Sequence, residues 1–309
     1  MKKQDNIIAI TGPTASGKTD LAARLAQDFD TEIISADSRL VFREFNIGVA
    51  KPSQEELALV KHHLVDVVSP LEDFSVSDFK NLANKVIEKL FEQNKTPIVA
   101  GGTGFYIKSL LEGLDIPKVP ADEGFRAEMR TLAKDHGNEY LYRILIEKDP
   151  AMAQKLHYND IFRVIRALEV IKSLNIPMSE AQKLNKPDFN VIYIGLDAKD
   201  RAFLYDRVNK RVDLMVEQGL FEEVEFLVKK YGETVSLLKT LGYKEVIDYF
   251  NNRLTKEEAV ELIKKNTRNF AKRQLTWFRT NKNINWFYID ENDNKNLTQK
   301  VREKCLSMM

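Results

Sequence analysis

A glycine-rich loop near the start of the chain constrains its fold more than any other feature, and it reads Gly12-Pro13-Thr14-Ala15-Ser16-Gly17-Lys18-Thr19. The loop matches G-x-x-x-x-G-K-[ST] and stands between an apolar β-branched run, Ile7 to Thr11, and a stretch with helical apolar spacing, Lys18 to Phe29. In this setting backbone N–H groups approach phosphate oxygens, and the helix N-terminus adds its positive end. Lys18 supplies a charge, and the Thr19 hydroxyl can reach a magnesium ion. We predict that residues 12–19 bind a polyphosphate, which the motif does not identify. A tight turn that binds nothing is the alternative.

The order of the elements predicts an α/β fold. Short apolar runs alternate with helical spacing, and Ser75 with Asp78 forms a capping box for a helix that runs toward Gln93. The expected strands are Ile7–Thr11, Glu32–Ser35, Pro97–Ala100, Val191–Leu196 and Ile284–Ile289. Helices are expected from about Asp200 to Trp277, with turns at Gly219, Gly232 and Gly242 and a second capping box at Thr255 and Glu258. We expect a P-loop NTPase-like parallel sheet flanked by helices, made of residues 1–117 and 188–309, with a helical insertion at 118–187.

Composition sets outer limits on function. A chain of 309 residues is long enough for roughly two domains, and 43% hydrophobic with 30% charged residues is typical of a globular protein. No apolar run approaches the roughly 18 residues that span a bilayer, so we expect no membrane partner. The basic N-terminus has no cleavage site, and the single cysteine, Cys305, excludes an internal disulfide and a multi-cysteine zinc site. We expect a cytoplasmic protein, with a monomer as the default state.

Two further loops follow predicted strands. Asp37 comes directly after the second strand, at the carboxyl end of the sheet, where open α/β folds bind ligands. The third strand runs into Gly101-Gly102-Thr103-Gly104, which suggests close approach of backbone to a ligand. Asp37 as a turn residue and the glycines as a tight turn are the alternatives. No apolar run ends in a clear Walker-B carboxylate, which favours a small-molecule transferase over a motor ATPase.

Taken together, these blocks resemble the tRNA dimethylallyltransferase (tRNA isopentenyltransferase) family, bacterial type, over nearly the whole chain. The matching segments include residues 12–19, Ser35-Ala36-Asp37-Ser38, Ile47 to Pro52, His62 to Asp66, Gly101 to Tyr106, Asn159-Asp160 with Arg163 and Arg166 to Glu169, Leu241 to Glu245, Asn266-Thr267-Arg268 and Ala271 to Arg279.

The resemblance implies prenyl transfer to RNA. A dimethylallyl group would move from dimethylallyl diphosphate to N6 of the adenosine 3′-adjacent to the anticodon (adenosine-37) of a tRNA, releasing diphosphate. The phosphate loop would then hold the diphosphate of the donor. Asp37 would orient the amine and accept its proton, while Lys18, Thr19 and Mg²⁺ neutralise the departing diphosphate. The target base would be flipped out of the anticodon loop.

The resemblance also implies a set of tRNA contacts: Asp37, Ser38, Arg39, Leu40, Thr103, Arg126, Phe162, Arg163, Arg166, Lys239, Gly242, Tyr243, Lys244, Lys264, Arg268 and Lys272. The chain departs from the family pattern in a few places. Ile161-Phe162 stands where the family commonly has Pro-Gln, a tRNA-contacting position, Phe42 where Tyr is usual and Val49 where Thr is frequent. The zinc finger of eukaryotic relatives is excluded by the single cysteine.

Several basic groups have both a functional and a structural interpretation. Net charge is only +1, from 47 basic and 46 acidic residues, so RNA contacts must come from local patches. Residues 262–283 hold seven basic residues and no acidic one. Lys264, Arg268 and Lys272 share a helix face, which either contacts phosphates or is solvated surface. The apolar residues Ile263, Phe270 and Trp277 mark a face expected to pack on the core.

Other charged groups leave a choice open. Arg163 and Arg166 either contact RNA or pair with Glu169, and Arg207 and Arg211 either reach the diphosphate or pair with Asp206 and Asp213. His62, His63 and Asp66 resemble a metal cluster. A metal needs three convergent ligands, so a structural hydrogen-bonding role is favoured.

Two competing functions remain at this point. A P-loop kinase acting on a small molecule would use Asp37 as the acceptor's base, but it leaves the helical insertion and the basic helix unexplained. A non-catalytic tRNA-binding protein is suggested by Ile161-Phe162, whereas the intact Gly17, Lys18, Thr19 and Asp37 argue against it.

Overall fold

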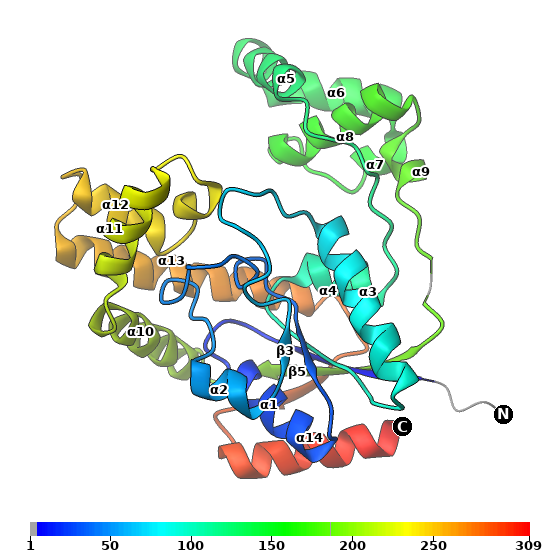
Figure 1. Ribbon diagram of the computed structural model, residues 1–309. Helices are drawn as coiled ribbons and strands as arrows, with labels where there is room; N and C mark the ends of the chain where they lie inside the picture. The colour runs from blue at the N-terminus through cyan, green and yellow to red at the C-terminus, as the bar shows by residue number, and fades with distance from the viewer. Residues whose placement is uncertain (1–4, 186) are drawn as a thin grey trace. The chain divides into compact units, whose positions relative to one another are not determined.

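The computed structural model describes residues 5–185 and 187–309, and its centre is one parallel β-sheet (Figure 1). The six strands are arranged in the order β3-β2-β4-β1-β5-β6, and every neighbouring pair is parallel. Their bounds are β1 Asn6–Thr11, β2 Ile33–Ser35, β3 His62–His63, β4 Ile98–Ala100, β5 Asn190–Asp197 and β6 Asn285–Tyr288. The predicted α/β fold with a parallel sheet is therefore confirmed.

The central strand explains why the apolar runs are continuous rather than alternating. All six residues of β1 are buried, because β1 lies between β4 and β5 and helices cover both faces of the sheet. Side chains of Ile8 and Ile10 point to one face, with those of Ile33 and Ile98 from neighbouring strands in the same apolar cluster. Ile7 and Ala9, of opposite orientation, are also fully buried.

Two helices pack on the first of these faces. Helix α1, Lys18–Asp28, follows the phosphate loop and buries Leu21, Ala22 and Leu25 against the sheet. Helix α14, Asn294–Met308, lies beside α1 and adds Leu297, Val301 and Cys305 to the cluster (Figure 1). The sequence prediction ended at the last strand and missed α14, whose polar composition leaves only a narrow apolar stripe.

The predicted capping boxes begin the helices expected of them. In α3, Val76–Glu92, the Ser75 hydroxyl accepts from the Asp78 N–H, and in α13, Lys256–Phe278, Thr255 and Glu258 make the same exchange. The predicted turns at Gly219, Gly232 and Gly242 are the ends of α11 and the start of α12. The remaining helices of this part are α2 Gln54–Leu59, α4 Gly104–Leu111, α10 Arg201–Glu217, α11 Leu220–Tyr231, the 3₁₀ helix η1 Ser236–Lys239 and α12 Tyr243–Phe250.

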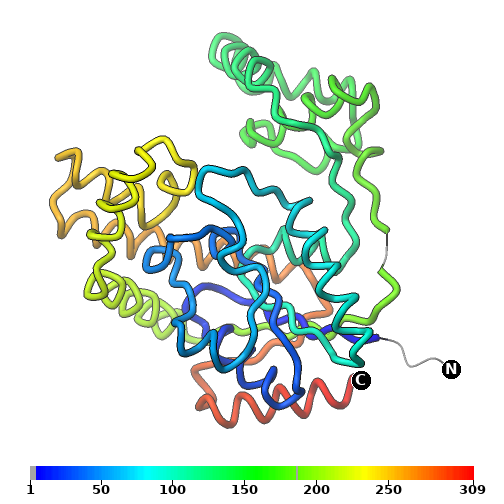
Figure 2. The backbone as a smooth tube through the Cα atoms, viewed as in Figure 1, coloured from blue at the N-terminus to red at the C-terminus, as the bar shows by residue number. Residues whose placement is uncertain are grey.

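The described chain divides into two compact units. One comprises the residues up to Leu110 together with Asp188–Met309, and the other comprises Leu111–Pro187. The second unit starts at 111, whereas the sequence placed its start at 118. The boundary differs because the segment around Leu114 pairs with the antiparallel segment around Leu184 near the end of this unit (Figure 2). The Asp115 N–H donates to the Lys183 carbonyl, and the Asn185 N–H donates to the Gly113 carbonyl.

The second unit is helical, as predicted, and has its own core. Its helices are α5 Glu123–His136, α6 Asn138–Lys148, α7 Pro150–Ala153, α8 Ile161–Leu174 and α9 Met178–Ala181. Leu141 and Leu145 from α6 pack with Val164 and Leu168 from α8. Within residues 5–185 and 187–309, no helix combines the length and apolar character needed to cross a membrane.

Candidate active site

The phosphate loop has the backbone geometry that its sequence predicts. Gly12 has φ +144°, and a Cβ there would lie 2.5 Å from the Leu196 carbonyl oxygen, so only glycine fits. Gly17, with φ +86°, is the N-cap of α1 and has no side chain between the helix N-terminus and the cavity. The Ser16 hydroxyl is buried and has no hydrogen-bond partner among the described residues.

Cations converge on the loop. Lys18 Nζ folds back and donates to the Pro13 carbonyl at 2.6 Å. Burial, with a smaller contribution from nearby Arg211 and an opposing one from Asp37, lowers the pKa of Lys18 from 10.5 to about 7. Burial also lowers the pKa of Arg211, with Arg39 contributing. Like charges held together in a desolvated site favour an anionic ligand, which would relieve their repulsion.

The side chain of Arg207 contacts the phosphate loop and not the two aspartates that the sequence offered as alternative partners. Its Nε donates to the carbonyl of Ala15 at 2.8 Å, so the side chain lies on the phosphate loop. The expected alternative partners are taken elsewhere, because Asp206 pairs with Lys210 at 2.8 Å and Asp213 with Lys264 at 2.8 Å. Arg211 lines the same cavity as Lys18.

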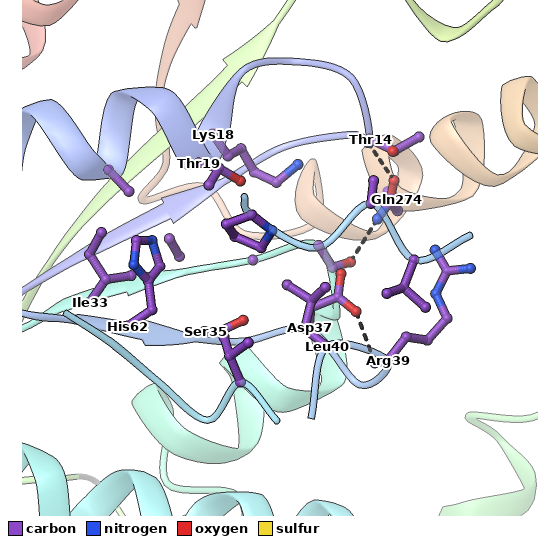
Figure 3. A pocket seen from close by; sticks show the side chains of 18 of the residues that line it. Thr14, Lys18, Thr19, Ile33, Ser35, Asp37, Arg39, Leu40, His62 and Gln274 are labelled. Atoms are coloured by element: carbon purple, nitrogen blue, oxygen red, sulfur yellow. Dashed lines mark hydrogen bonds between the residues drawn. The ribbon is translucent and has the colours of Figure 1, made fainter. Parts of the chain in front are cut away.

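The cavity beside the phosphate loop contains charged and apolar walls (Figure 3). Lys18, Thr19, Asp37, Arg39 and Arg211 supply its charged and polar groups. The apolar wall is formed by Ala22, Ile33, Leu40, Val49, Ala50, Pro52, Val65 and Phe270. A pocket lined by phosphate-loop residues and by a set of apolar side chains suits a ligand that has an anionic head and a short hydrocarbon tail.

Asp37 and Thr103, which the sequence singled out separately, belong to one hydrogen-bonded structure. Thr103 N–H donates to the Ala36 carbonyl, and the Ser38 N–H donates to the Thr103 hydroxyl oxygen, both at 3.1 Å. One Asp37 carboxylate oxygen accepts the Arg39 N–H at 2.9 Å. A Cβ on Gly101 would overlap the Ala36 backbone, so the glycine permits this close approach. Asp37 itself lines the cavity.

Gln274, on α13, is a cavity residue that the sequence reasoning did not single out. Its Oε1 accepts the Thr14 N–H at 2.8 Å, and its Nε2 donates to the Gly102 carbonyl at 3.0 Å (Figure 3). The signal was present in the sequence: on α13 the buried residues recur as Ile263, Thr267, Ala271 and Gln274, so an amide occupies a core-facing position. The expected apolar face was only partly right. Ile263 is buried, but Phe270 and Trp277 are partly exposed, and Phe270 lines the cavity.

The basic face of α13 is partly occupied. Lys264 bonds to Asp213 at 2.8 Å and Glu261 at 3.0 Å, and Arg268 donates to Asn209 at 2.6 Å. Lys272 is exposed and lies 5.7 Å from the centre of the Tyr205 ring. Of the three, Lys272 is the most available to a ligand.

In the segment that contains Gly242 and Tyr243, burial contradicts an expected RNA contact. Tyr243 is 0% exposed, and its hydroxyl donates to Glu223 at 2.8 Å, so its side chain cannot contact RNA as the sequence predicted. The same Glu223 carboxylate accepts the N–H groups of Asn46, Ile47 and Gly48 at 2.8–3.0 Å, which fixes the loop that carries Val49 and Ala50. Gly242 is also buried, whereas Lys239 and Lys244 are exposed. Arg39 connects this segment to the cavity through a 3.3 Å bond to the Leu241 carbonyl.

In the helical unit, two predicted RNA contacts are engaged in a buried ion cluster. Glu169 is 1% exposed, and its carboxylate accepts from Arg126 Nε at 2.8 Å and from Arg166. Burial is the largest single influence on the pKa of Glu169 and would raise it. Hydrogen bonds, including those from Arg126 and Arg166, together outweigh burial and hold this pKa below its usual value. Phe162 is 68% exposed, and Arg163 next to it pairs with Asp160 at 3.3 Å. Pairing with Glu169 therefore applies to Arg166 and not to Arg163.

The paired histidines have the hydrogen-bonding role that the sequence favoured. His63 Nε2 bonds to Glu32 at 2.5 Å, His62 Nδ1 to the Val60 carbonyl at 2.8 Å, and Asp66 to Lys51 at 2.5 Å. In the described parts of the chain, no group of three His, Cys, Asp or Glu side chains is arranged to hold a metal ion.

Comparisons of sequence place the chain among known proteins. The family model described as IPP transferase matches residues 40–281. The tRNA dimethylallyltransferase of Acetivibrio thermocellus is 47% identical over 293 residues, which cover 94% of this chain and 93% of that protein. The tRNA dimethylallyltransferase 2 of Geotalea daltonii is 44% identical, with 93% of this chain and 89% of that protein covered.

Solved structures agree in fold. The full-length tRNA isopentenylpyrophosphate transferase from Bacillus halodurans matches with a TM-score of 0.74 at 38% identity, over 99% of this chain and 96% of that one. A eukaryotic dimethylallyltransferase described as acting on tRNA matches with a TM-score of 0.78 at 26% identity, over 96% of this chain and 77% of that one.

Proposed function

The chain belongs to the IPP transferase family, and from this membership and its cavity we propose that it is a tRNA dimethylallyltransferase. It transfers a dimethylallyl group from dimethylallyl diphosphate to N6 of the adenosine 3′-adjacent to the anticodon (adenosine-37), and it releases diphosphate. The tRNA anticodon stem-loop is its macromolecular partner, and the chain acts as a monomer.

One observation carries the proposal: a carboxylate, a phosphate loop and an apolar wall face the same cavity. Lys18 and Arg211 lie on the diphosphate side, Asp37 lies on the side of the Thr103 loop, and residues such as Ile33 and Val49 form the wall. A phosphate loop that served only a nucleotide would not require this apolar wall. A five-carbon allylic tail fits it, because burial of each CH₂ contributes about 0.8 kcal/mol.

The residues have complementary roles in the transfer. Residues 12–19, with Arg207 and Arg211, bind the diphosphate and stabilise the charge that grows on it as the C–O bond breaks. Asp37 accepts a hydrogen bond from the N6 amine and takes its proton as the new C–N bond forms. Thr103, held beside Ser38, is positioned to contact the same nucleotide. The bonds balance: one C–O bond breaks, one C–N bond forms, and the N6 proton moves to the Asp37 carboxylate.

The donor atoms available fit Mg²⁺ as a substrate-borne ion. Thr19 offers an exposed hydroxyl beside Lys18, and the chemistry of Mg²⁺ favours one or two protein oxygens together with phosphate oxygens and water. Thr19 would hold the ion against the diphosphate, and the ion would add positive charge on the leaving group.

RNA binding is assigned to exposed cations around the cavity and in the helical unit. Lys272, Lys244 and Lys239 are exposed, and so are Arg163 and Phe162 on α8. Arg39 and Leu40 line the cavity with Asp37, where a flipped adenosine would enter, and Ser38 follows Asp37 directly in the same turn. Because Phe162 and Arg163 are exposed, we propose that the helical insertion also contacts tRNA. The partly engaged Arg126, Arg166, Lys264 and Arg268 would have to exchange a protein partner for a phosphate.

Mass spectrometry of a tRNA tests the reaction directly. An unmodified tRNA with an adenosine-rich anticodon loop is incubated with the protein, Mg²⁺ and dimethylallyl diphosphate, and a parallel reaction contains ATP instead. We expect a prenyl mass increment on the nucleoside next to the anticodon. Phosphoryl transfer in the ATP reaction, or no increment although tRNA binds, contradicts the proposal.

The role of Asp37 has its own test. Asp37→Ala removes the proton acceptor but no cation, so transfer should slow by about 10²–10⁴-fold while tRNA affinity changes little. Asp73→Ala is the matched control, because Asp73 is exposed and is not among the residues that line the cavity. Equal losses of transfer and tRNA affinity in Asp37→Ala would exclude the role as base.

A further inference from the structure

Among the described residues, Gln274 is the one whose side-chain amide accepts a hydrogen bond from the phosphate loop and donates one to the Gly101–Gly104 loop. Its carbonyl end accepts the Thr14 N–H of the phosphate loop, and its amino end donates to the Gly102 carbonyl. These partners are 260 and 172 residues away in the chain. The side chain is 7% exposed, so solvent does not compete for either bond.

The Gly102 bond connects Gln274 to the catalytic side of the cavity. Gly102 precedes Thr103, whose N–H and hydroxyl bond to the Ala36 carbonyl and the Ser38 N–H on either side of Asp37. The links therefore run from Thr14 through Gln274 and Thr103 to the Asp37 turn. Figure 3 shows Gln274 between Thr14 and the segment that carries Asp37.

The chemistry of this position selects an amide of this length. One end must accept a backbone N–H and the other must donate to a backbone carbonyl, which a neutral amide does and a carboxylate does not. A Cβ on Gly102 would overlap Gln274 Nε2, so that glycine leaves room for the amide. The Thr14 N–H is thereby satisfied within the protein.

We propose that Gln274 is a positioning residue that fixes the phosphate loop relative to Asp37, so that the donor carbon and the base lie at transfer distance. This inference rests on the proposed prenyl transfer. Each loop keeps its own internal contacts without Gln274, so substrate binding should persist while the rate of transfer falls. A misplacement of about 1 Å between reacting groups can cost about 10²-fold in rate.

The test compares three variants by transfer kinetics. Gln274→Met keeps the length of the side chain but removes both hydrogen bonds. We expect kcat to fall about 100-fold, while KM for dimethylallyl diphosphate and Kd for tRNA change less than about threefold. Gln299→Met on α14 is the matched control, because Gln299 is exposed and bonds only to Glu303 among the described residues.

Gln274→Glu gives a readout that a merely structural role would not move. The ionised carboxylate accepts from Thr14 but repels the Gly102 carbonyl, whereas the protonated carboxyl reproduces the pattern of the amide. The ratio of variant to wild-type kcat should therefore rise as pH falls. This pH profile decides the matter if Gln274→Met does not fold.

The outcomes separate this inference from the proposed function. If the wild-type protein fails to modify tRNA, the proposed function fails, and the role of Gln274 in that transfer fails with it. If wild type is active, an unchanged kcat in Gln274→Met, a rise in both KM and Kd at constant kcat, or a pH-independent ratio for Gln274→Glu overturns the role of Gln274.

Discussion

The most informative perturbation is to change the protonation state of the Lys18 amine. Burial, with Arg211 next in importance, lowers the pKa of this amine to about 7 in the ligand-free protein, against an ordinary value of 10.5. A bound diphosphate places an anion beside the amine and should return this pKa to the ordinary range or above it. Binding of the donor is then coupled to the uptake of a proton by Lys18.

The magnitude follows from the two pKa values. At pH 7 about half of the Lys18 amines are charged, so binding should take up about half a proton. At pH 8.5, above this pKa, most of the amines are neutral, and uptake should approach one proton. Between about pH 8 and pH 10, Kd for the donor should therefore rise about tenfold per pH unit, and below about pH 6 it should not depend on Lys18.

Titration calorimetry in two buffers of different ionisation enthalpy measures this uptake. Dimethylallyl diphosphate is titrated into the protein in HEPES and in Tris at pH 8.5, and the difference in heat gives the number of protons bound. Lys18→Arg is the matched variant, because a guanidinium stays charged throughout this pH range. Its uptake should be smaller by about one proton, which also corrects for ionisation of the ligand itself.

Either of two results would refute the reasoning. One is equal proton uptake by wild type and Lys18→Arg, which would mean that Lys18 is already charged at pH 8.5. The other is a donor affinity that does not change between pH 7 and pH 9.

Two further predictions concern stability. Glu169→Ala leaves Arg126 and Arg166 without their shared buried carboxylate and should lower the free energy of unfolding in urea by about 3 kcal/mol, whereas the exposed Glu128→Ala should stay within about 0.5 kcal/mol. The pKa of Glu169 is lowered in the folded protein, so the stabilisation by its carboxylate is present above about pH 5 and is lost as pH falls below the unfolded pKa of 4.5. A difference in unfolding free energy between wild type and Glu169→Ala that does not change with pH across that range would contradict this. Glu223→Ala removes the hydrogen-bond acceptor of the Tyr243 hydroxyl and of three loop N–H groups, so it should lower the free energy of unfolding by about 2–3 kcal/mol. Thermal unfolding measures this, with Glu222→Ala as control. Equal melting temperatures for the two variants would exclude the role of Glu223 in holding the loop.

The sequence alone determined most of the elements that build the fold. The phosphate loop was recognisable because a strand, two glycines, a lysine and a helix start all lie within a short stretch of chain. The capping boxes at Ser75 and Thr255 were equally local, since the bonded groups are three residues apart. Asp37 was a sound candidate for the same reason: its position follows from the end of a strand.

The tertiary structure decided which of these local features meet. Gln274 reaches Thr14 across 260 residues, and Arg207 reaches Ala15 across 192, although the sequence left Arg207 open and gave Gln274 no role. Burial of Tyr243 against Glu223 and Gly48 likewise removed a predicted RNA contact. Hydrogen bonding within a helix or turn is encoded by neighbouring residues. The partner of a buried polar side chain is chosen by the packing of helices on the sheet, and periodicity along the chain carries no information about that packing.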